Sequence, residues 1–288
     1  MSVLRRPAVK NLLLLLCLSV LLSACSRIDL AYSNLDWLLP WRLNSYLNLD
    51  SQQQAWLKPR LQAHLQWHCS RELPDYLVWL DNTQAILAEA QPDSARLYKQ
   101  FGEFDGALKR INVEITPTAI ELLRGLSDEQ VEGLFATLDE DNLEDRQDFL
   151  DPPVAVQISE RQTRMQERLR PWLGRLNEAQ LQHLANWASG LGEQNRLWLE
   201  NRELWQQALR EALALRHTAD FAEQLTPLLQ TRERFYSDAY RANYSRSRQA
   251  IATLFSQVLS SSDASQRERL NHRLRDIRQD LAGQSCSA

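Results

Sequence analysis

The sequence predicts an all-α protein, an elongated helical bundle. Glycine is scarce, with 8 in 288 residues, and the dominant residues, among them Leu, Ala, Gln and Glu, lose little side-chain freedom in a helix. Four short polar residues each open an apolar helical pattern in the same way. No stretch alternates apolar and polar residues between turn residues, so we expect no β-sheet.

The first 25 residues have the pattern of a targeting segment. Basic residues precede an eleven-residue apolar run, 12–22, and small residues lie just before Cys25. The run is too short for a transmembrane helix, which takes about 20 apolar residues. Leu22-Ser23-Ala24-Cys25 resembles a bacterial lipobox, and this resemblance implies cleavage before Cys25, lipidation of that cysteine and membrane anchoring. An ordinary cleaved signal or a short uncleaved anchor are the alternatives.

The segment after the lipobox predicts a destination and a tether. Ser26 rather than Asp follows the cysteine, and by resemblance to enterobacterial sorting this favours the periplasmic face of the outer membrane. Residues 25–48 are predicted to form a lipidated N-terminus and tether. Trp37 and Trp41 lie four apart, so they share a face if the tether is helical. Their rings either lie at the lipid headgroups or pack against the body, and we favour packing.

Composition and cysteine usage limit the partners. Loss of the first 24 residues, which contain three basic residues and no acid, changes the net charge from −4 to −7, whereas nucleic-acid-binding domains are basic. We expect no nucleic-acid partner and no cofactor. In an oxidising periplasm the two remaining thiols, Cys69 and Cys286, are a candidate disulfide. The alternative is that Cys286 lies in a frayed tail.

Four predicted helix starts share one motif. A short polar residue is followed three residues later by Gln and seven residues later by Leu. This pattern is a capping box, in which the polar side chain and the Gln side chain each bind the other residue's backbone N–H, and the Leu begins the buried stripe. The polar residues are Asp50, Ser127, Asn177 and Asp263, and the glutamines are Gln53, Gln130, Gln180 and Gln266.

The spacing of the boxes indicates an internal repeat. The first two boxes are 77 residues apart and the last two are 86 apart, and in each half an acidic cap, Asp93 or Asp220, follows the first box by 43 residues. We predict helical halves at 49–151 and 152–282, joined near Pro152-Pro153, and a tail at 283–288. The low side-chain identity between the halves argues against a duplication.

Proline and glycine predict other helix boundaries. Pro74 is expected to interrupt the first long helix, and Gly125 to end a later one. Helix starts are also predicted at two Thr-Pro pairs, Thr116-Pro117 and Thr226-Pro227.

The boxes resemble a known motif. Leu49-Asp50-Ser51-Gln52-Gln53, Leu126-Ser127-Asp128-Glu129-Gln130 and Leu176-Asn177-Glu178-Ala179-Gln180 are similar to the LTxxQ motif of Spy/CpxP-type periplasmic proteins, although none has Thr at the cap. Those proteins are small helical chaperones and stress regulators. The whole chain, with Tyr32-Ser33-Asn34-Leu35-Asp36-Trp37 after the lipobox, more closely resembles an uncharacterised family of proteobacterial helical lipoproteins with no assigned activity.

Two clusters could bind cations. His64, His68 and Glu72 could face one metal ion on a helix, but we favour histidines at an interface and predict no metal site. The acidic residues between Asp139 and Asp151 fit no EF-hand, and we expect them to form a solvated face. No nucleophile-and-base pattern and no phosphate loop occurs in the sequence, so we predict no enzyme.

The stretch 232–248 interleaves arginines with aromatic residues. One interpretation is a mixed aromatic and cationic surface that holds extended chains or anionic polymers through cation–π contacts. The other, which we favour, is a helix-helix seam whose arginines pair with acids. The candidate partner-binding residues are Arg234, Tyr236, Tyr240, Arg241, Tyr244 and Arg248.

These features together predict a function. We expect an outer-membrane lipoprotein that binds envelope proteins, chaperone-like, on an amphipathic helical surface, by analogy with the LTxxQ proteins. The alternatives are a structural scaffold that docks one specific envelope partner, and a cell-wall or lipid hydrolase, which would need a deep cleft with convergent polar groups.

Replacing the predicted lipid-bearing residue tests the anchor. Cys25→Ala should release the protein from membranes, because the acyl chains that bury in the bilayer are then absent. Centrifugation of cell extracts measures this as a move from the membrane pellet to the supernatant. A variant that still pellets would identify the tryptophans of the tether, rather than lipid, as the main anchor.

Overall fold

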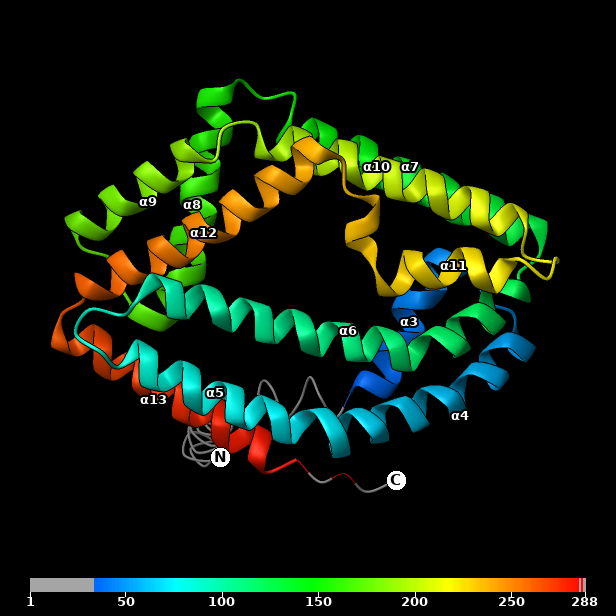
Figure 1. Cartoon of the computed structure of the whole chain (residues 1–288), viewed down its shortest axis with the longest axis horizontal. Coiled ribbons are helices and arrows are strands. Elements are labelled where there is room, and N and C mark those ends of the chain that lie inside the picture. The colour runs from blue at the N-terminus through cyan, green and yellow to red at the C-terminus, as the bar shows by residue number, and fades with distance from the viewer. Residues whose placement is uncertain (1–33, 285, 287–288) are drawn as a thin grey trace, which may run out of the picture.

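The computed structural model describes residues 34–284 and Cys286, which form an elongated all-α bundle (Figure 1). The predicted fold class is confirmed, and the described residues contain no strand. The lipobox and Cys25 lie outside this part of the chain. The helices are α3 (Leu35–Leu47), α4 (Ser51–Trp67), the π-helix η2 (His68–Glu72), α5 (Leu73–Leu87), α6 (Ser94–Arg124), α7 (Asp128–Phe149), α8 (Val154–Leu173), α9 (Glu178–Gly190), α10 (Gln194–Ala214), α11 (Phe221–Gln230), the 3₁₀ helix η3 (Arg232–Phe235), α12 (Asp238–Ser260) and α13 (Ala264–Ala282).

All four predicted capping boxes are confirmed, at the starts of α4, α7, α9 and α13. In the first box, Asp50 Oδ1 accepts a hydrogen bond from the backbone N–H of Gln53 at 2.8 Å, and Gln53 Oε1 accepts one from the N–H of Asp50 at 2.9 Å. Each box satisfies two backbone donors that a helix start leaves unpaired.

The glutamines of the first two boxes also bind each other. Gln53 Nε2 donates to Gln130 Oε1 at 3.0 Å, and Gln130 Nε2 donates to Gln53 Oε1 at 2.7 Å. Each amide also donates to the segment that precedes the other helix, Gln53 to the carbonyl of Gly125 and Gln130 to that of Asn48, both at 2.9 Å. The starts of α4 and α7 are thereby held side by side.

The last two boxes repeat this arrangement in a more buried place. The amides of Gln180 and Gln266 bind each other at 2.9 and 3.0 Å, and the two residues are 0% and 5% exposed. Gln180 Nε2 also donates to the carbonyl of Val258, and Gln266 Nε2 to that of Arg175. The starts of α9 and α13 therefore meet as those of α4 and α7 do.

Two sets of four helices around the boxes have equivalent contacts. In the first set α3 contacts α4 and α7, and α4 contacts α6; in the second set α8 contacts α9 and α13, and α9 contacts α12. This correspondence in chain order is what a duplication predicts, and the duplication stays a hypothesis. We call these sets the first and second quartets.

The helices that lie between two boxes in the sequence pack on the other quartet. Helix α5 follows the first quartet's α4 but packs on α13, and α10 and α11 follow α9 but pack on α7 and α6 (Figure 1). The core of the first quartet accordingly contains Leu213, Phe221 and Leu225, and the core of the second contains Leu80. The sequence halves are thus interlocked in the packing. No helix in the described part of the chain is long and apolar enough to cross a membrane.

The predicted helix starts at the Thr-Pro pairs are wrong. Pro117 lies within α6 and Pro227 within α11. In each pair the threonine hydroxyl donates to the carbonyl four residues earlier, which is Asn112 for Thr116 and Ala222 for Thr226. This bond lies next to the backbone donor that proline lacks, and packing on both sides maintains the helix.

The predicted packing of the two tether tryptophans against the body is also wrong. Trp37 and Trp41 are 61% and 59% exposed, and their rings stack on each other at 6.3 Å between centroids. Leu43, Tyr46 and Leu47 of the same helix instead make the contact with the first core. One face of α3 is thus occupied, and the tryptophans lie off it.

The predicted solvated acidic face is in part a seam between α7 and α10. Asp139 pairs with Arg210 at 3.2 Å, and Arg202 pairs with both Asp141 and Asp145. Asp145 is 25% exposed. The acids therefore contribute to helix packing, because α10 carries arginines at matching positions along its length.

Removing one amide from each glutamine pair tests how much that pair stabilises the fold. Gln180→Met should lower the free energy of unfolding by about 3 kcal/mol, because the buried amide of Gln266, the carbonyl of Val258 and the backbone N–H of Asn177 each lose a hydrogen bond. The same change at Gln53, which is partly exposed to water, should cost about 1 kcal/mol. Urea unfolding measures both losses. The comparison requires that the slope of the unfolding free energy against urea concentration is the same in each variant. Equal losses would contradict the view that burial sets the cost.

Candidate functional site

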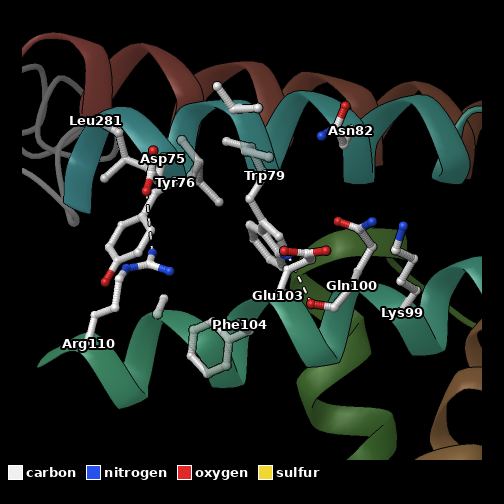
Figure 2. A pocket seen from close by; sticks show the side chains of 14 residues that line it. Asp75, Tyr76, Trp79, Asn82, Lys99, Gln100, Glu103, Phe104, Arg110 and Leu281 are labelled. Atoms are coloured by element: carbon white, nitrogen blue, oxygen red, sulfur yellow. Dashed lines mark hydrogen bonds and ion pairs between the residues drawn. The ribbon is translucent and has the colours of Figure 1, made fainter. Parts of the chain in front are cut away.

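A groove of 470 Å³ lies between α5 and α6 and is closed on one side by α13 (Figure 2). Its apolar floor includes Val78 and Trp79 from α5, Phe104 from α6, and Ile277 and Leu281 from α13. Val78 is 60% exposed and Phe104 is 49% exposed. Trp79, Ile277 and Leu281 are partly buried against the second core. The two exposed apolar side chains beside them are typical of a binding surface.

Hydrogen bonds fix the aromatic part of the groove. Trp79 Nε1 donates to the carbonyl of Gln100 at 3.0 Å, and the hydroxyl of Thr83 donates to the carbonyl of Trp79 and binds the side chain of Gln100. The rings of Trp79 and Phe104 lie 6.2 Å apart. The Trp79 ring is therefore held in place before anything binds.

Charges of both signs lie around this apolar floor. Lys99 and Glu103 come from α6, and at the other end of the groove Arg110 lies beside Asp75 and Tyr76 (Figure 2). The lining suits recognition of a polypeptide segment, which carries apolar and charged groups together.

The position of Arg110 depends on a buried carboxylate in the π-helix. Its guanidinium donates to both oxygens of Glu72, at 2.9 and 2.8 Å, and approaches Asp75 at 3.4 Å. Glu72 is 2% exposed, so this pair supplies the counter-charge that its burial requires. The hydrogen bond to Glu72 is the main reason that the pKa of Arg110 is raised.

A disulfide lies close to this end of the groove. Cys69 in η2 and Cys286 after α13 are joined by a disulfide, with their Cα atoms 5.5 Å apart. The bond closes a loop with a sequence separation of 217 residues. Because Leu281 lies only five residues before Cys286, the disulfide also holds the part of α13 that walls the groove.

The three tyrosines predicted as partner-binding residues form one cluster. Tyr236, Tyr240 and Tyr244 have ring centroids 4.8 to 6.0 Å apart, and all three side chains are half-buried. Burial, and then the neighbouring tyrosines, raises the pKa of Tyr240 to about 12. The Tyr240 hydroxyl therefore stays protonated at neutral pH. Tyr240 and Tyr244 line a cavity of 430 Å³ between α8, α9 and α12.

The three predicted arginines are divided between this cavity and the surface. Arg248 lines the cavity, pairs with Asp105 and donates to the Tyr244 hydroxyl at 3.0 Å. Arg241 is exposed and donates to the carbonyls of Glu233 and Tyr236, and Arg234 is exposed. The structure therefore does not bring the six candidate residues together into one open surface, and partner binding by them stays a prediction.

The three candidate metal-binding residues bind separate protein groups. His64 lies 3.2 Å from Glu114 and 2.8 Å from the hydroxyl of Thr118, and His68 lies 3.1 Å from the hydroxyl of Tyr76. Burial lowers the pKa of His68. Glu72, the third member, is engaged by Arg110 as described above. Within the described residues no group of His, Cys, Asp or Glu has an arrangement that could hold a metal ion.

Comparison with protein families identifies the chain's relatives. A family model described as a family of unknown function, DUF6279, matches residues 45–241. The chain belongs to DUF6279. The matched residues include α5 and α6, the two helices between which the groove lies. The match ends within α12. The DUF6279 assignment agrees with the resemblance to an uncharacterised family. Neither the curated proteins nor the solved structures contain a match to this chain.

The groove residues were missed in the sequence because their pattern resembles a core pattern. Phe104 lies seven residues after the buried Leu97 on α6. Helical spacing predicts a shared face, but it does not distinguish a buried face from an exposed one. No local signal therefore marked Phe104 as an exposed residue.

Opening the disulfide tests its role in holding the end of α13. Cys286→Ser should lower the free energy of unfolding by up to about 5 kcal/mol, because the unfolded chain regains the freedom of a very long loop. Urea unfolding with and without a thiol reductant measures this. Reductant should bring the wild-type chain to the stability of the variant and leave the variant unchanged. A wild-type chain that is indifferent to reductant would contradict the prediction.

Proposed function

We propose that the protein is a lipid-anchored lipoprotein of the outer membrane that binds segments of envelope proteins, chaperone-like, in the groove between α5 and α6. The observation that carries this proposal is the exposed apolar floor of the groove, with Val78 and Phe104 about half accessible to water between charges of both signs. A partly unfolded chain offers apolar side chains that such a floor can bury, and charges that the rim can pair.

Three further features support the location and the class. A disulfide such as that between Cys69 and Cys286 is typical of proteins in an oxidising compartment such as the periplasm. The exposed Trp37 and Trp41, close to the predicted anchor, are suited to contact with lipid headgroups. Paired glutamines in the capping boxes match the motif by which the sequence resembles the LTxxQ proteins.

Aggregation assays test the proposed binding. The full chain should suppress the aggregation of several unrelated denatured proteins, measured by light scattering. The double variant Val78→Ser and Phe104→Ser should lose most of this activity, because it removes apolar area from the groove without touching the buried core.

A matched control removes similar apolar area elsewhere. Val154 is 65% exposed and Leu204 is 53% exposed, and neither lines the groove, so the double variant Val154→Ser and Leu204→Ser should suppress aggregation as the wild type does. Equal loss in both variants would contradict a role for the groove. No suppression by the wild type, together with one stoichiometric partner in a pull-down, would identify a scaffold instead.

A further inference from the structure

The cavity between α8, α9 and α12 is separate from the groove and has an unusual lining. Four arginines line it, and none of the described lining residues is acidic. This contrasts with the chain as a whole, which has more acids than bases. The four arginines are Arg161, Arg164, Arg168 and Arg248.

Three of these arginines form a stripe along α8. Arg161, Arg164 and Arg168 lie three or four residues apart, so their side chains follow one face of the helix. Arg164 has a carboxylate partner, Glu160 at 3.4 Å, whereas Arg168 is exposed and has no ion pair among the described residues. From α12, Arg248 completes the set and pairs with Asp105.

Arg161 is a buried cation without a carboxylate partner. It is 6% exposed, and it donates to the carbonyl of Ala188 at 2.7 Å and to the side chain of Asn195 at 3.3 Å. These acceptors and the carbonyl of Gly192 orient the Arg161 guanidinium toward the C-terminal end of α9. None of them carries a full negative charge. Burial, and then the charge of Arg164, lowers the pKa of Arg161. An anion beside Arg161 and Arg164 would offset both the cost of burying the Arg161 charge and the repulsion between the two cations.

Two buried polar atoms at the cavity lack partners. Trp187 Nε1 and Ser247 Oγ are the buried side-chain nitrogen and oxygen atoms without a hydrogen bond in the described part of the chain, and both residues line this cavity. A buried donor left unpaired costs about 1–3 kcal/mol. Two such groups beside uncompensated arginines offer extra donors to one ligand.

The remaining lining provides an apolar side. Met165, Ile251 and the rings of Tyr240 and Tyr244 line the same cavity. A volume of 430 Å³ lies in the range of small-molecule sites, and it exceeds what a free inorganic anion fills. The occupant therefore has an organic part as well as its charge.

We propose that this cavity binds a phosphate ester, with its phosphoryl oxygens on Arg161 and Arg168 and its organic part against Tyr240 and Tyr244. Two uncompensated guanidinium groups match the charge of a phosphate dianion, and their planar forks match its oxygens. Ser247 and Trp187 donate the additional hydrogen bonds. A soluble phosphate ester and the headgroup of an anionic phospholipid share this chemistry.

Titration of the full chain carrying Cys25→Ala, which excludes a lipid anchor, tests the proposal. Calorimetry with glycerol 3-phosphate should give one site per chain, and sodium chloride at equal ionic strength should give none. Flotation with vesicles of phosphatidylglycerol against vesicles of phosphatidylcholine tests the lipid source. Binding to the soluble ester or selective binding to the anionic vesicles supports the site. The absence of both would overturn it.

Variants separate binding from stability. Arg168→Gln, at an exposed position, should weaken binding about tenfold, because one charge-assisted contact is lost. Arg246→Gln is the matched control, since Arg246 is exposed on α12 and does not line the cavity, and its affinity should equal that of the wild type. Equal weakening in both variants would indicate a general charge effect and overturn the site.

Ser247→Ala gives a readout that a structural role would not move. The variant should bind several-fold more weakly but be at least as stable as the wild type, because the lost hydroxyl has no hydrogen bond in the free protein. A variant with lower stability and unchanged affinity would contradict the assigned role. Arg161→Gln should also weaken binding, but Arg168→Gln keeps the test valid if the buried change prevents folding.

Discussion

The exchange of hydrogen bonds between paired glutamine amides is the constraint on which this fold depends. Each amide oxygen accepts from its own helix start and from the partner amide, and each amide nitrogen donates to the partner and to the segment before the partner's helix. All of its hydrogen-bonding groups are thereby used, so a residue such as Gln180 can be fully buried. The result fixes two helix starts against each other in position and register.

This constraint explains why the helices between the boxes leave their own quartet. Once α4 is held to α7, and α9 to α13, the intervening α5 and the pair α10 and α11 find their apolar partners across the molecule. Leu80 then joins the second core, and Leu213 and Phe221 join the first. The disulfide between Cys69 and Cys286 joins the π-helix before α5 to the segment after α13. The groove forms where α5 meets α6 and α13.

The fold class and the helix starts could be predicted from the sequence because their causes are local. A capping box lies within four residues, so Asp50 and Asn177 were recognisable without knowing their surroundings. The pairing of Gln53 with Gln130 depends on 77 residues of intervening chain, and no local pattern encodes it. The exposure of Phe104 and Trp37 also depends on which neighbour occupies each helix face, which is why the groove and the free tryptophans were not predicted.

The contrast between two residues of α9 argues that the arginine-lined cavity is not a packing defect. Gln180 is fully buried and makes every hydrogen bond available to it, whereas seven residues later Trp187 has a buried Nε1 without a partner. One helix therefore contains both outcomes, within about two turns. A fold that satisfies a buried amide so completely has the means to satisfy an indole, and buried unpaired groups in native proteins concentrate where function requires them. The donors at Trp187 and Ser247 are then best understood as half of an interaction that a ligand completes.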